Sequence, residues 1–374
     1  MTSEDAFTVT PWEVKGEVDY DKLIQKFGTS PITDDIVERL KKHVKEIHPF
    51  LRRRIFFSHR DMDWILNKYE SGEKFFLYTG RGPSGHTHLG HLVPWIFTQY
   101  LQKEFDAELY FQMTDDEKFL HNTELTLDQT LAYTYENALD VIACGFDPKK
   151  TFIFSDIEYS KTLYKIAVKI SKHITFSTAK AVFGFENNTN IGMIFFPSFQ
   201  AAPCFLPSVL KGTNIPCLIP AAIDQDNYWR GIAREVAPKL GFYKPAQIHS
   251  KFIPGLGKGG KMSASEPETA IFTVDTPKVA HKKIMSAFTG GRATVKEQKE
   301  QGGTPEICPV YHYYNLLLKT DKEIEEVCSG CKSGSLLCGE DKLRLSEVIG
   351  KFLTEHQRKR EDAKKIIEKF MLRD

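Results

Sequence analysis

Two short stretches, far apart in the chain, hold residue types that could bind a nucleoside triphosphate. Residues 80–91 combine four glycines with a His-Leu-Gly-His sequence after an apolar run, and residues 260–265 combine a lysine with two serines. Backbone N–H groups at a helix start, imidazoles and an ammonium are suitable donors for phosphate oxygens during transfer at phosphorus. The side chains that supply these donors are His88, His91 and Lys261, and the hydroxyls of Ser263 and Ser265 follow the lysine in the second stretch.

The two histidines could instead cap or pack the first turn of a helix. Residues three apart share one helix face, and anions bind at helix N-termini. Gly90, between His88 and His91, allows a ligand to approach the backbone closely. This combination favours a binding role.

The spacing of Gly80, Gly82 and Gly85 also matches the dinucleotide-binding pattern. That pattern expects an acidic residue about twenty positions on, at the end of the second strand. Glu104 and Asp106 lie near that distance but precede the second predicted strand. A dehydrogenase is therefore the less favoured interpretation.

The composition is that of an ordinary globular protein. The chain has 374 residues, 41% of them hydrophobic and 26% charged, with a formal net charge of +1. It is long enough for two domains, and no apolar run approaches a membrane span. The acidic start, residues 1–5, lacks the order of a signal peptide. We expect a cytoplasmic protein without a membrane partner, and a local basic face would suffice for nucleic acid.

Four of the seven cysteines, Cys308, Cys328, Cys331 and Cys338, fall in one short region. Four thiols could hold zinc or an iron–sulfur cluster. The region has one C-x-x-C pair, whereas a zinc ribbon has two. Reduced thiols in a helical domain are favoured, and we assign no metal ligand.

Strand and helix patterns alternate in the first three quarters of the chain and then become helical. Short runs at 75–78, 109–111, 151–154, 217–219 and 246–249 indicate strands of one parallel sheet. Helical patterns separate these runs, and residues 160–210 are mostly helical. After residue 276 the predicted helices are 278–288, 309–318, 322–327 and 342–370. The order predicts an α/β, doubly wound sheet followed by an all-helical domain.

The stretches 88–91 and 261–265 resemble the two signatures of class I aminoacyl-tRNA synthetases. Other stretches are similar to tryptophanyl-tRNA synthetases of the archaeal and eukaryotic cytosolic type. They are 10–12, 19–24, 78–84, 112–118, 196–203 and 222–226.

The resemblance covers nearly the whole chain and implies its organisation. A Rossmann-like catalytic domain would span 71–275, with a helical dimerisation insertion at about 160–210. A helical anticodon-binding domain would span 276–374, and residues 1–70 would form an extension that packs on the catalytic domain. The family activates L-tryptophan with ATP and Mg²⁺ to tryptophanyl-adenylate, transfers it to the 3′-terminal adenosine of tRNA(Trp), and acts as a homodimer.

The resemblance also implies roles in phosphoryl chemistry, where positioning and charge stabilisation dominate. Lys261 would follow charge onto the leaving pyrophosphate, supported by Ser263 and Ser265. Ala264 stands where many class I members have a second lysine, so one ammonium remains for this task. The residues that the resemblance assigns to ATP binding are Arg81, Gly82, Ser84, Gly90, Asp224, Gln225 and Met262.

For the amino acid, the resemblance implies that Tyr78 and Gln112 accept the indole N–H. Lys118 would bind the carboxylate. The ammonium would be bound by Glu117, Gln200 and Gln225. Tyr78 and Gln112 could instead simply pack at strand ends. Residues 115–118 could instead be a charged run in contact with solvent.

The nearest alternative is a tyrosyl-tRNA synthetase, which shares the fold and signatures. Such enzymes place an Asp after a Gln-x-x run to accept the phenol, whereas this chain has Pro203 there. A buried phenol without a partner would lose roughly 1–3 kcal/mol. A nucleotidyltransferase and a non-catalytic tRNA-binding relative are further alternatives. The long helical region argues against the first, and the intact signatures argue against the second.

Sequence features that indicate binding of tRNA, the expected second substrate, are weaker than those for ATP. Residues 341–374 hold ten Lys or Arg against seven Asp or Glu, and 355–360 form a basic helical turn. That turn could contact phosphates or simply be a solvated face. Arg292, in a Gly-Gly-Arg turn similar to one near the family's anticodon contact, is the candidate tRNA residue. Ala293 departs from the acidic residue that human-type enzymes carry next.

Overall fold

A computed structural model describes residues 7–9, 14–16, 18–318 and 320–374. Near the start, β1 (Phe7–Val9) pairs antiparallel with β2 (Val14–Gly16). The run 7–10 indicates a short strand in the sequence, and a strand is confirmed at 7–9. Its expected end at Pro11, and the stretch 10–12 used for the resemblance, lie outside the described residues.

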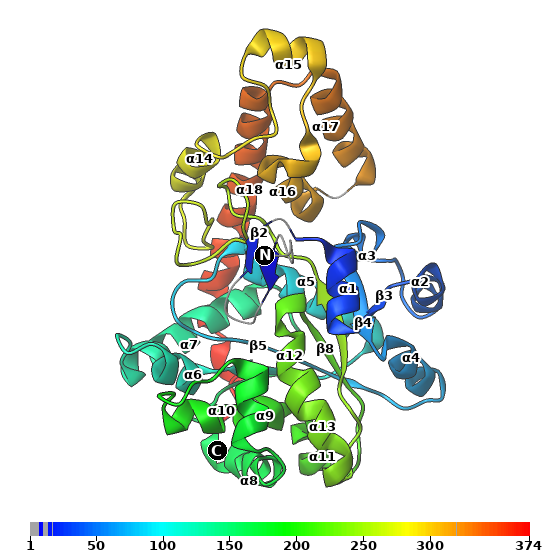
Figure 1. The fold of residues 1–374 in the computed structure, drawn as a ribbon, viewed down its shortest axis with the longest axis vertical. Helices are drawn as coiled ribbons and strands as arrows, with labels where there is room; N and C mark the ends of the chain where they lie inside the picture. Colours follow the sequence, from blue (N-terminus) through cyan, green and yellow to red (C-terminus); the bar gives the residue numbers. More distant parts are fainter. Residues whose placement is uncertain (1–6, 10–13, 17, 319) are drawn as a thin grey trace, which may run out of the picture.

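The predicted parallel sheet is confirmed and forms the centre of the molecule (Figure 1). Its parallel strands, in spatial order, are β9 (Ala246–Ser250), β8 (Cys217–Ala222), β5 (Phe76–Arg81), β6 (Leu109–Met113) and β7 (Thr151–Ser155). Their burial on both faces explains the largely apolar runs in the sequence. The order reverses between β5 and β8, and ligands bind at such a point in doubly wound sheets.

Two antiparallel strands from the N-terminal region extend the same sheet. They are β3 (Ser30–Pro31) and β4 (Phe56–Arg60), and β4 pairs with β9. The sequence analysis predicted no strand here, because β4 ends in polar residues. These are buried through polar contacts: Ser58 Oγ lies 3.1 Å from His249 Nδ1, and Arg60 Nε donates to Asp226 Oδ1 at 2.5 Å.

Helices cover the sheet and then continue as a helical region (Figure 1). Those up to the last parallel strand are α1 (Tyr20–Phe27), α2 (Asp34–Lys41), α3 (Pro49–Arg52), α4 (Met62–Glu70), α5 (Leu89–Phe105), α6 (Asp115–His121), α7 (Leu127–Ala143), α8 (Ser160–Ser171), α9 (Phe176–Phe183), α10 (Ile191–Ala201), α11 (Leu206–Lys211), α12 (Asp226–Tyr228) and α13 (Arg234–Val236). Those that follow are α14 (Pro277–Met285), α15 (Val295–Gln301), α16 (Pro309–Leu317), α17 (Asp321–Ser333) and α18 (Cys338–Lys364).

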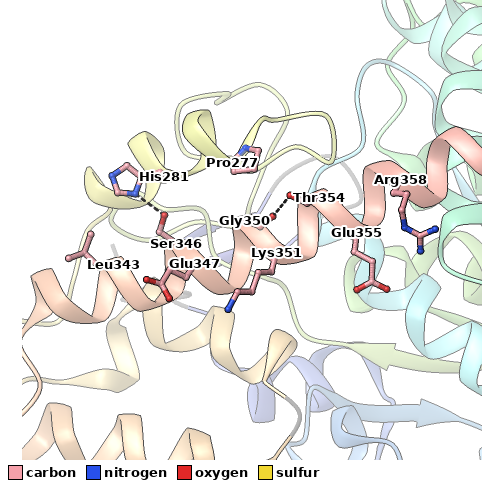
Figure 2. A pocket seen from close by; sticks show the side chains of 10 residues that line it. All are labelled: Pro277, His281, Leu343, Ser346, Glu347, Gly350, Lys351, Thr354, Glu355 and Arg358. Carbon is pink, nitrogen blue, oxygen red and sulfur yellow. Dashed lines mark hydrogen bonds between the residues drawn. The ribbon is translucent and has the colours of Figure 1, made fainter.

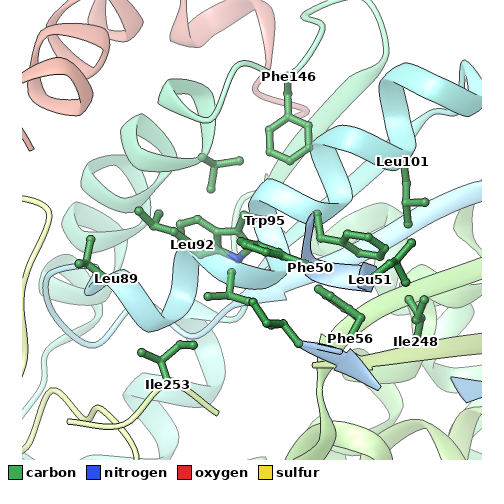
Figure 3. Close-up of a cluster of buried hydrophobic side chains, with 14 of the residues drawn as sticks. Phe50, Leu51, Phe56, Leu89, Leu92, Trp95, Leu101, Phe146, Ile248 and Ile253 are labelled. Carbon is green, nitrogen blue, oxygen red and sulfur yellow. The ribbon is translucent and has the colours of Figure 1, made fainter. Parts of the chain in front are cut away.

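The largest buried apolar cluster lies between the sheet and α5. Trp95 and Phe97 of this helix are almost completely buried, and the Phe97 ring stacks on Phe56 of β4 with centroids 3.9 Å apart. Figure 3 shows these layers meeting around Trp95, with Ile248 of β9 on the sheet side. The core therefore fixes the start of α5, where the signature histidines lie.

The helix α18 joins the helical region to the sheet. At 1.5 Å per residue its 27 residues span about 40 Å. It packs on α14 and α16 and then on α7. Beyond it, the Ile153 N–H donates to the Phe370 carbonyl at 2.8 Å, so the chain end pairs with the edge strand β7.

The contact of α18 with α7 corrects the expectation for the basic turn 355–360. His356 Nε2 lies 2.9 Å from Asp140 Oδ1, and Arg360 pairs with Asp140 and Glu136. Both His356 and Arg360 are buried. These two side chains form an internal ion-pair cluster and are neither solvated nor placed to contact phosphates.

Candidate active site

The turn between β5 and α5 depends on glycine because other backbone and side-chain atoms approach it closely. A Cβ on Gly80 would lie 2.8 Å from the backbone oxygen of Gln112, and a Cβ on Gly82 would overlap Cε of Lys118. Glycine therefore lets the end of β6 and the start of α6 reach the turn.

Arg81 ends β5 and is held by a residue that the sequence analysis missed. Its Nε donates to Asn137 Oδ1 at 3.1 Å, and Asn137 Nδ2 donates to the Gly85 carbonyl at 3.0 Å. Burial lowers the pKa of Arg81 to about 10, so the guanidinium is charged at neutral pH. Its Nη2 is buried without a hydrogen-bond partner. The turn thus presents a preorganised cation with a free donor.

His88 and His91 stack on one another at the start of α5, with ring centroids 3.6 Å apart. The His88 N–H donates to His91 Nδ1 at 3.1 Å, which leaves Nε2 as the N–H donor of a neutral His91 ring. Burial, with the charges of Arg81 and Lys261 adding to it, lowers the pKa of His88 to about 3 and that of His91 well below its usual range. Both imidazoles are neutral donors or acceptors at pH 7.

The two signature stretches meet, since a Cβ on Gly90 would lie 3.7 Å from Cβ of Met262. In the second stretch, Lys261 Nζ donates to Asp224 Oδ2 at 2.9 Å, and Asp224 Oδ1 is buried without a hydrogen-bond partner. The side chain of Met262 is buried, and its N–H donates to the Ile253 carbonyl at 2.8 Å. Met262 thus anchors the loop that carries Lys261.

The other predicted phosphate-site residues lie on the rims of this region. Ser263 Oγ and Ser265 Oγ are 2.8 Å apart, so the two hydroxyls form one polar tip of the loop. Ser84 is exposed in the glycine turn, and Gln225 is half-buried next to Asp224. The His88 ring packs against Gly90, since a Cβ on Gly90 would be only 3.0 Å from His88 Nδ1. Gly90 therefore makes room for this histidine.

Tyr78 and Gln112 form a buried polar pair on the neighbouring strands β5 and β6. The Tyr78 hydroxyl donates to Gln112 Oε1 at 2.5 Å and lies 3.0 Å from the Gln200 carbonyl, while Gln200 Nε2 lies 3.3 Å from the hydroxyl. Burial raises the pKa of Tyr78 well above its usual range, so the hydroxyl keeps its proton. The predicted indole-binding residues are thus brought together.

Glu117 and Lys118 pair with each other at the start of α6, with Nζ and Oε2 2.8 Å apart. Thr114 Oγ1 lies 3.4 Å from the same carboxylate. One anion and one cation, side by side next to Gly82, match the two charges of an amino acid zwitterion. The arrangement can bind an amino acid beside a triphosphate.

Comparison with known proteins agrees with this geometry. The pattern of tRNA synthetases class I (W and Y) matches residues 70–354. The chain belongs to this family of class I tRNA synthetases. A tryptophan–tRNA ligase of Pyrococcus furiosus is 54% identical over 371 residues, covering 98% of this chain and 94% of that protein. One of Pyrobaculum aerophilum is 50% identical over 369 residues, covering 99% and 98%.

Solved structures of class I synthetases share the fold over almost the whole chain. A tryptophanyl-tRNA synthetase of Plasmodium falciparum superposes with a TM-score of 0.89 at 42% identity, covering 94% of this chain and 97% of that one. One from Encephalitozoon cuniculi, bound to tryptophan, gives 0.87 at 38% identity, covering 95% and 98%. The predicted fold class and family are thereby confirmed.

Arg292, the candidate tRNA residue, lies in the helical region, away from the turn between β5 and α5. It precedes α15, at the end of the molecule opposite α8 in Figure 1. Its side chain is exposed, and Nε donates to the Gly302 carbonyl at 2.9 Å. The structure does not bring it to the other predicted residues.

A groove of about 740 Å³ lies between α14 and α18, and none of the predicted site residues is among those that line it (Figure 2). Two lining residues contact each other, with His281 Nδ1 2.8 Å from Ser346 Oγ. Lys351 and Arg358 of α18 line it together with Glu347 and Glu355. Of the basic side chains near 355–360, Arg358 is thus one that faces an open groove.

The described residues contain neither a metal-binding cluster of His, Cys, Asp or Glu nor a membrane-spanning helix. Across 7–9, 14–16, 18–318 and 320–374, no set of three or more His, Cys, Asp or Glu side chains is arranged to hold a metal ion. No helix in that part of the chain combines the length and apolarity needed to cross a membrane.

Proposed function

We propose that this chain activates L-tryptophan with ATP and transfers the tryptophanyl group to the 3′-terminal adenosine of tRNA(Trp). The observation that carries the proposal is the buried Tyr78–Gln112 pair, whose oxygens suit an indole N–H, beside the turn that holds Arg81 and the signature histidines. The relatives named tryptophan–tRNA ligase, matched over nearly their whole length, support the same activity.

Tyrosine suits this pocket less well. The position after Gln200-Ala201-Ala202 is Pro203, which is buried in a 3₁₀ turn and has no side-chain acceptor. A phenol O–H that reached this position would find no side-chain acceptor there, and a buried O–H without a partner costs roughly 1–3 kcal/mol. The site therefore favours tryptophan over tyrosine.

In the activation step, a carboxylate oxygen of tryptophan attacks the α-phosphorus of ATP, and the bond to pyrophosphate breaks. The protein contributes position and charge. The free Nη2 of Arg81 and the Nε2–H of His91 are suitable donors to phosphate oxygens. Lys261 would leave Asp224 and follow the negative charge onto pyrophosphate, with Ser263 and Ser265 at the same loop tip.

Tryptophan would separate the Glu117–Lys118 pair and take both partners. The ammonium replaces Lys118 at the Glu117 carboxylate, with Gln200 and Gln225 as further acceptors, and the carboxylate binds Lys118. Because both charges of the pair find new opposite charges, the exchange avoids leaving either one buried and unpaired.

We infer that Mg²⁺ is used and enters on the triphosphate. Mg²⁺ is commonly bound by substrate phosphates and one or two carboxylates. The donor set here fits such an ion, since Asp224 has a buried oxygen without a hydrogen-bond partner beside Lys261. When bound, the ion would neutralise charge on the phosphates.

We infer that the protein acts as a homodimer through the helices between β7 and β8. Large apolar side chains are exposed there: Tyr164 by 56%, Val168 by 42% and Ile191 by 84%. The Tyr164 and Phe195 rings lie 6.2 Å apart, which places α8 and α10 on a common face. Exposed apolar patches of this kind mark interaction surfaces.

We propose the following division of the chain into domains. Residues 71–275 would form the catalytic domain and 276–374 the anticodon-binding domain, with 1–70 as an extension whose strands β3 and β4 join the sheet. The tRNA would contact the helical region near Arg292. The seven cysteines are free thiols, which supports a reducing compartment such as the cytoplasm.

Amino-acid-dependent exchange of pyrophosphate into ATP, run over all standard amino acids, tests the proposed activity. Tryptophan should support the fastest exchange and tyrosine only background. Faster exchange with tyrosine would overturn the assignment. Charging of tRNA(Trp) by the same preparation tests the second step.

A further inference from the structure

The side-chain amide of Gln112 has a donor end and an acceptor end, and its neighbours determine which end faces the amino acid pocket. Its Nε2 lies 2.8 and 2.9 Å from the two carboxyl oxygens of Asp156. Its Oε1 lies 2.5 Å from the Tyr78 hydroxyl oxygen. An amide between these two neighbours makes its hydrogen bonds in only one of its two orientations.

The three residues come from three adjacent parallel strands or the position directly after one. Tyr78 lies on β5, Gln112 on β6 and Asp156 directly after β7, and each is at most 1% exposed. Three buried side chains thus form one hydrogen-bonded row across the sheet, with Asp156 at the end away from Tyr78. Gln112 has no freedom to turn without losing both contacts with Asp156.

Asp156 remains an acceptor toward Gln112 whatever its protonation. Burial raises its pKa well above the usual range, and the nearby Asp116 and Asp115 add to this shift. Burial likewise raises the pKa of Asp116 to about 7, and a hydrogen bond joins the two carboxyls. A carboxylic acid carries its proton on one oxygen only, and both Asp156 oxygens lie within 2.9 Å of Gln112 Nε2, so one of them accepts from the NH₂ group in either protonation state.

We propose that Asp156 is a positioning residue for amino acid selection: it holds the Gln112 amide with its carbonyl toward the pocket, so that the pocket selects a side chain with a ring N–H. This inference rests on the proposed function. The Gln112 carbonyl has a second lone pair beyond the one used by Tyr78. A turned amide would place its NH₂ group against the indole N–H, leaving a buried donor without a partner.

The test compares tryptophan with its analogue in which sulfur replaces the ring N–H, 3-benzothienylalanine. The two have nearly the same shape, so the ratio of their kcat/KM values in amino acid activation reports the N–H contact. The unsubstituted protein should favour tryptophan by about tenfold or more, since a site built to bind an N–H rejects a ligand lacking it.

In Asp156→Asn the substituted side chain can donate to the Gln112 carbonyl as well as accept from its NH₂ group. Gln112 can therefore also turn its NH₂ group toward the pocket. The preference for tryptophan should then fall by about tenfold, with the KM for ATP unchanged. Asp115→Asn is the matched control. Asp115 lies in the same carboxyl cluster but contacts Ser155, Thr134 and the Ile157 N–H instead of Gln112. This control should keep the original ratio.

A role of Asp156 in folding alone would lower activity toward both amino acids equally, and an unchanged ratio in Asp156→Asn would overturn the inference. If that variant is insoluble, Asp156→Ser gives the same comparison with a smaller neutral side chain. Equal activation of both amino acids by the unsubstituted protein would also overturn it. Fastest exchange with tyrosine would instead overturn the proposed function, so the two failures are distinguishable.

Discussion

Lys261 Nζ lies 2.9 Å from Asp224 Oδ2, so the only lysine of the second signature is bound to a buried carboxylate. The pair joins the loop that contains residues 260–265 to the residues that follow β8. Because Ala264 replaces the second lysine of many class I enzymes, no other ammonium in residues 260–265 can take over. Phosphate must therefore compete with Asp224 for Lys261.

Removal of that ammonium should affect the reaction more than substrate binding. We expect Lys261→Ala to lower amino acid activation by on the order of 10²-fold or more, with tryptophan binding largely kept. Pyrophosphate exchange and tryptophan fluorescence titration measure the two effects. Lys258→Ala, an exposed lysine of the same loop, is the control. A near-normal rate in Lys261→Ala would remove this residue from the mechanism.

Asn137 should matter for ATP because it holds Arg81 and Gly85 at once. We expect Asn137→Leu to raise the KM for ATP by about tenfold through loss of two hydrogen bonds, each worth about 1 kcal/mol, while the KM for tryptophan changes little. Thr134→Val, one turn earlier on α7, serves as a control because Thr134 contacts Asp115 rather than Arg81. An unaltered KM for ATP would contradict this role.

The stability of the protein should fall on acidification, partly through His48. Burial, together with Arg52 and Arg53, lowers its pKa to about 4 from the ordinary 6.5. Between these values the unfolded chain binds more protons, so stability is lost as pH falls, by at most about 1.4 kcal/mol per pH unit.

His48→Asn separates this titration from the structural role of the residue. His48 Nδ1 accepts the Phe50 N–H at 3.1 Å at the start of α3, and asparagine is a good replacement in that position. Urea unfolding from pH 7 to pH 4.5 should show a shallower pH dependence in the variant. An identical slope would show that His48 does not titrate in this range.

Ile191→Lys should weaken the proposed homodimer, because it places a charge on the most exposed large apolar side chain of α10. Light scattering should show a dimer for the unsubstituted protein and a shift toward monomer for the variant. Val295→Lys, exposed by 60% on α15, changes an apolar residue in the helical region and should remain a dimer. A monomeric unsubstituted protein would refute the proposal.

Arg292→Ala should lower tRNA charging by about tenfold and leave pyrophosphate exchange unchanged, as expected for a contact made only by tRNA. Lys296→Ala, on the exposed face of α15, tests whether any nearby positive charge has the same effect. An unchanged rate of tRNA charging in Arg292→Ala would contradict the role of Arg292 as a tRNA contact.

Local sequence signals predicted the parts of the fold that depend on local patterns. The apolar runs of β5, β6 and β7 and the apolar face of α5 are visible without knowledge of their partners. The helix α15 was not predicted, because its residues Val295–Gln301 lack apolar periodicity. The Thr294-x-x-Glu297 capping box was the available signal.

In the site, too, local signals could be identified and long-range contacts could not. The two signatures are short continuous stretches. Asn137 contacts Arg81 and Asp156 contacts Gln112, and each pair is far apart in the sequence. A lone Asn in a helix and an Asp after a strand carry no signal by themselves. Their roles follow from strand order, which brings them beside the site.

The pairing of β7 with the chain end has a consequence for biosynthesis. The Ile153 backbone bonds to Phe370 and Leu372, and the buried Asp140 has His356 and Arg360 as partners. A ribosome completes every strand of the sheet about a hundred residues before it makes these partners. During that interval the nascent chain holds an open sheet edge at β7, and Asp140 lacks both of these cationic partners.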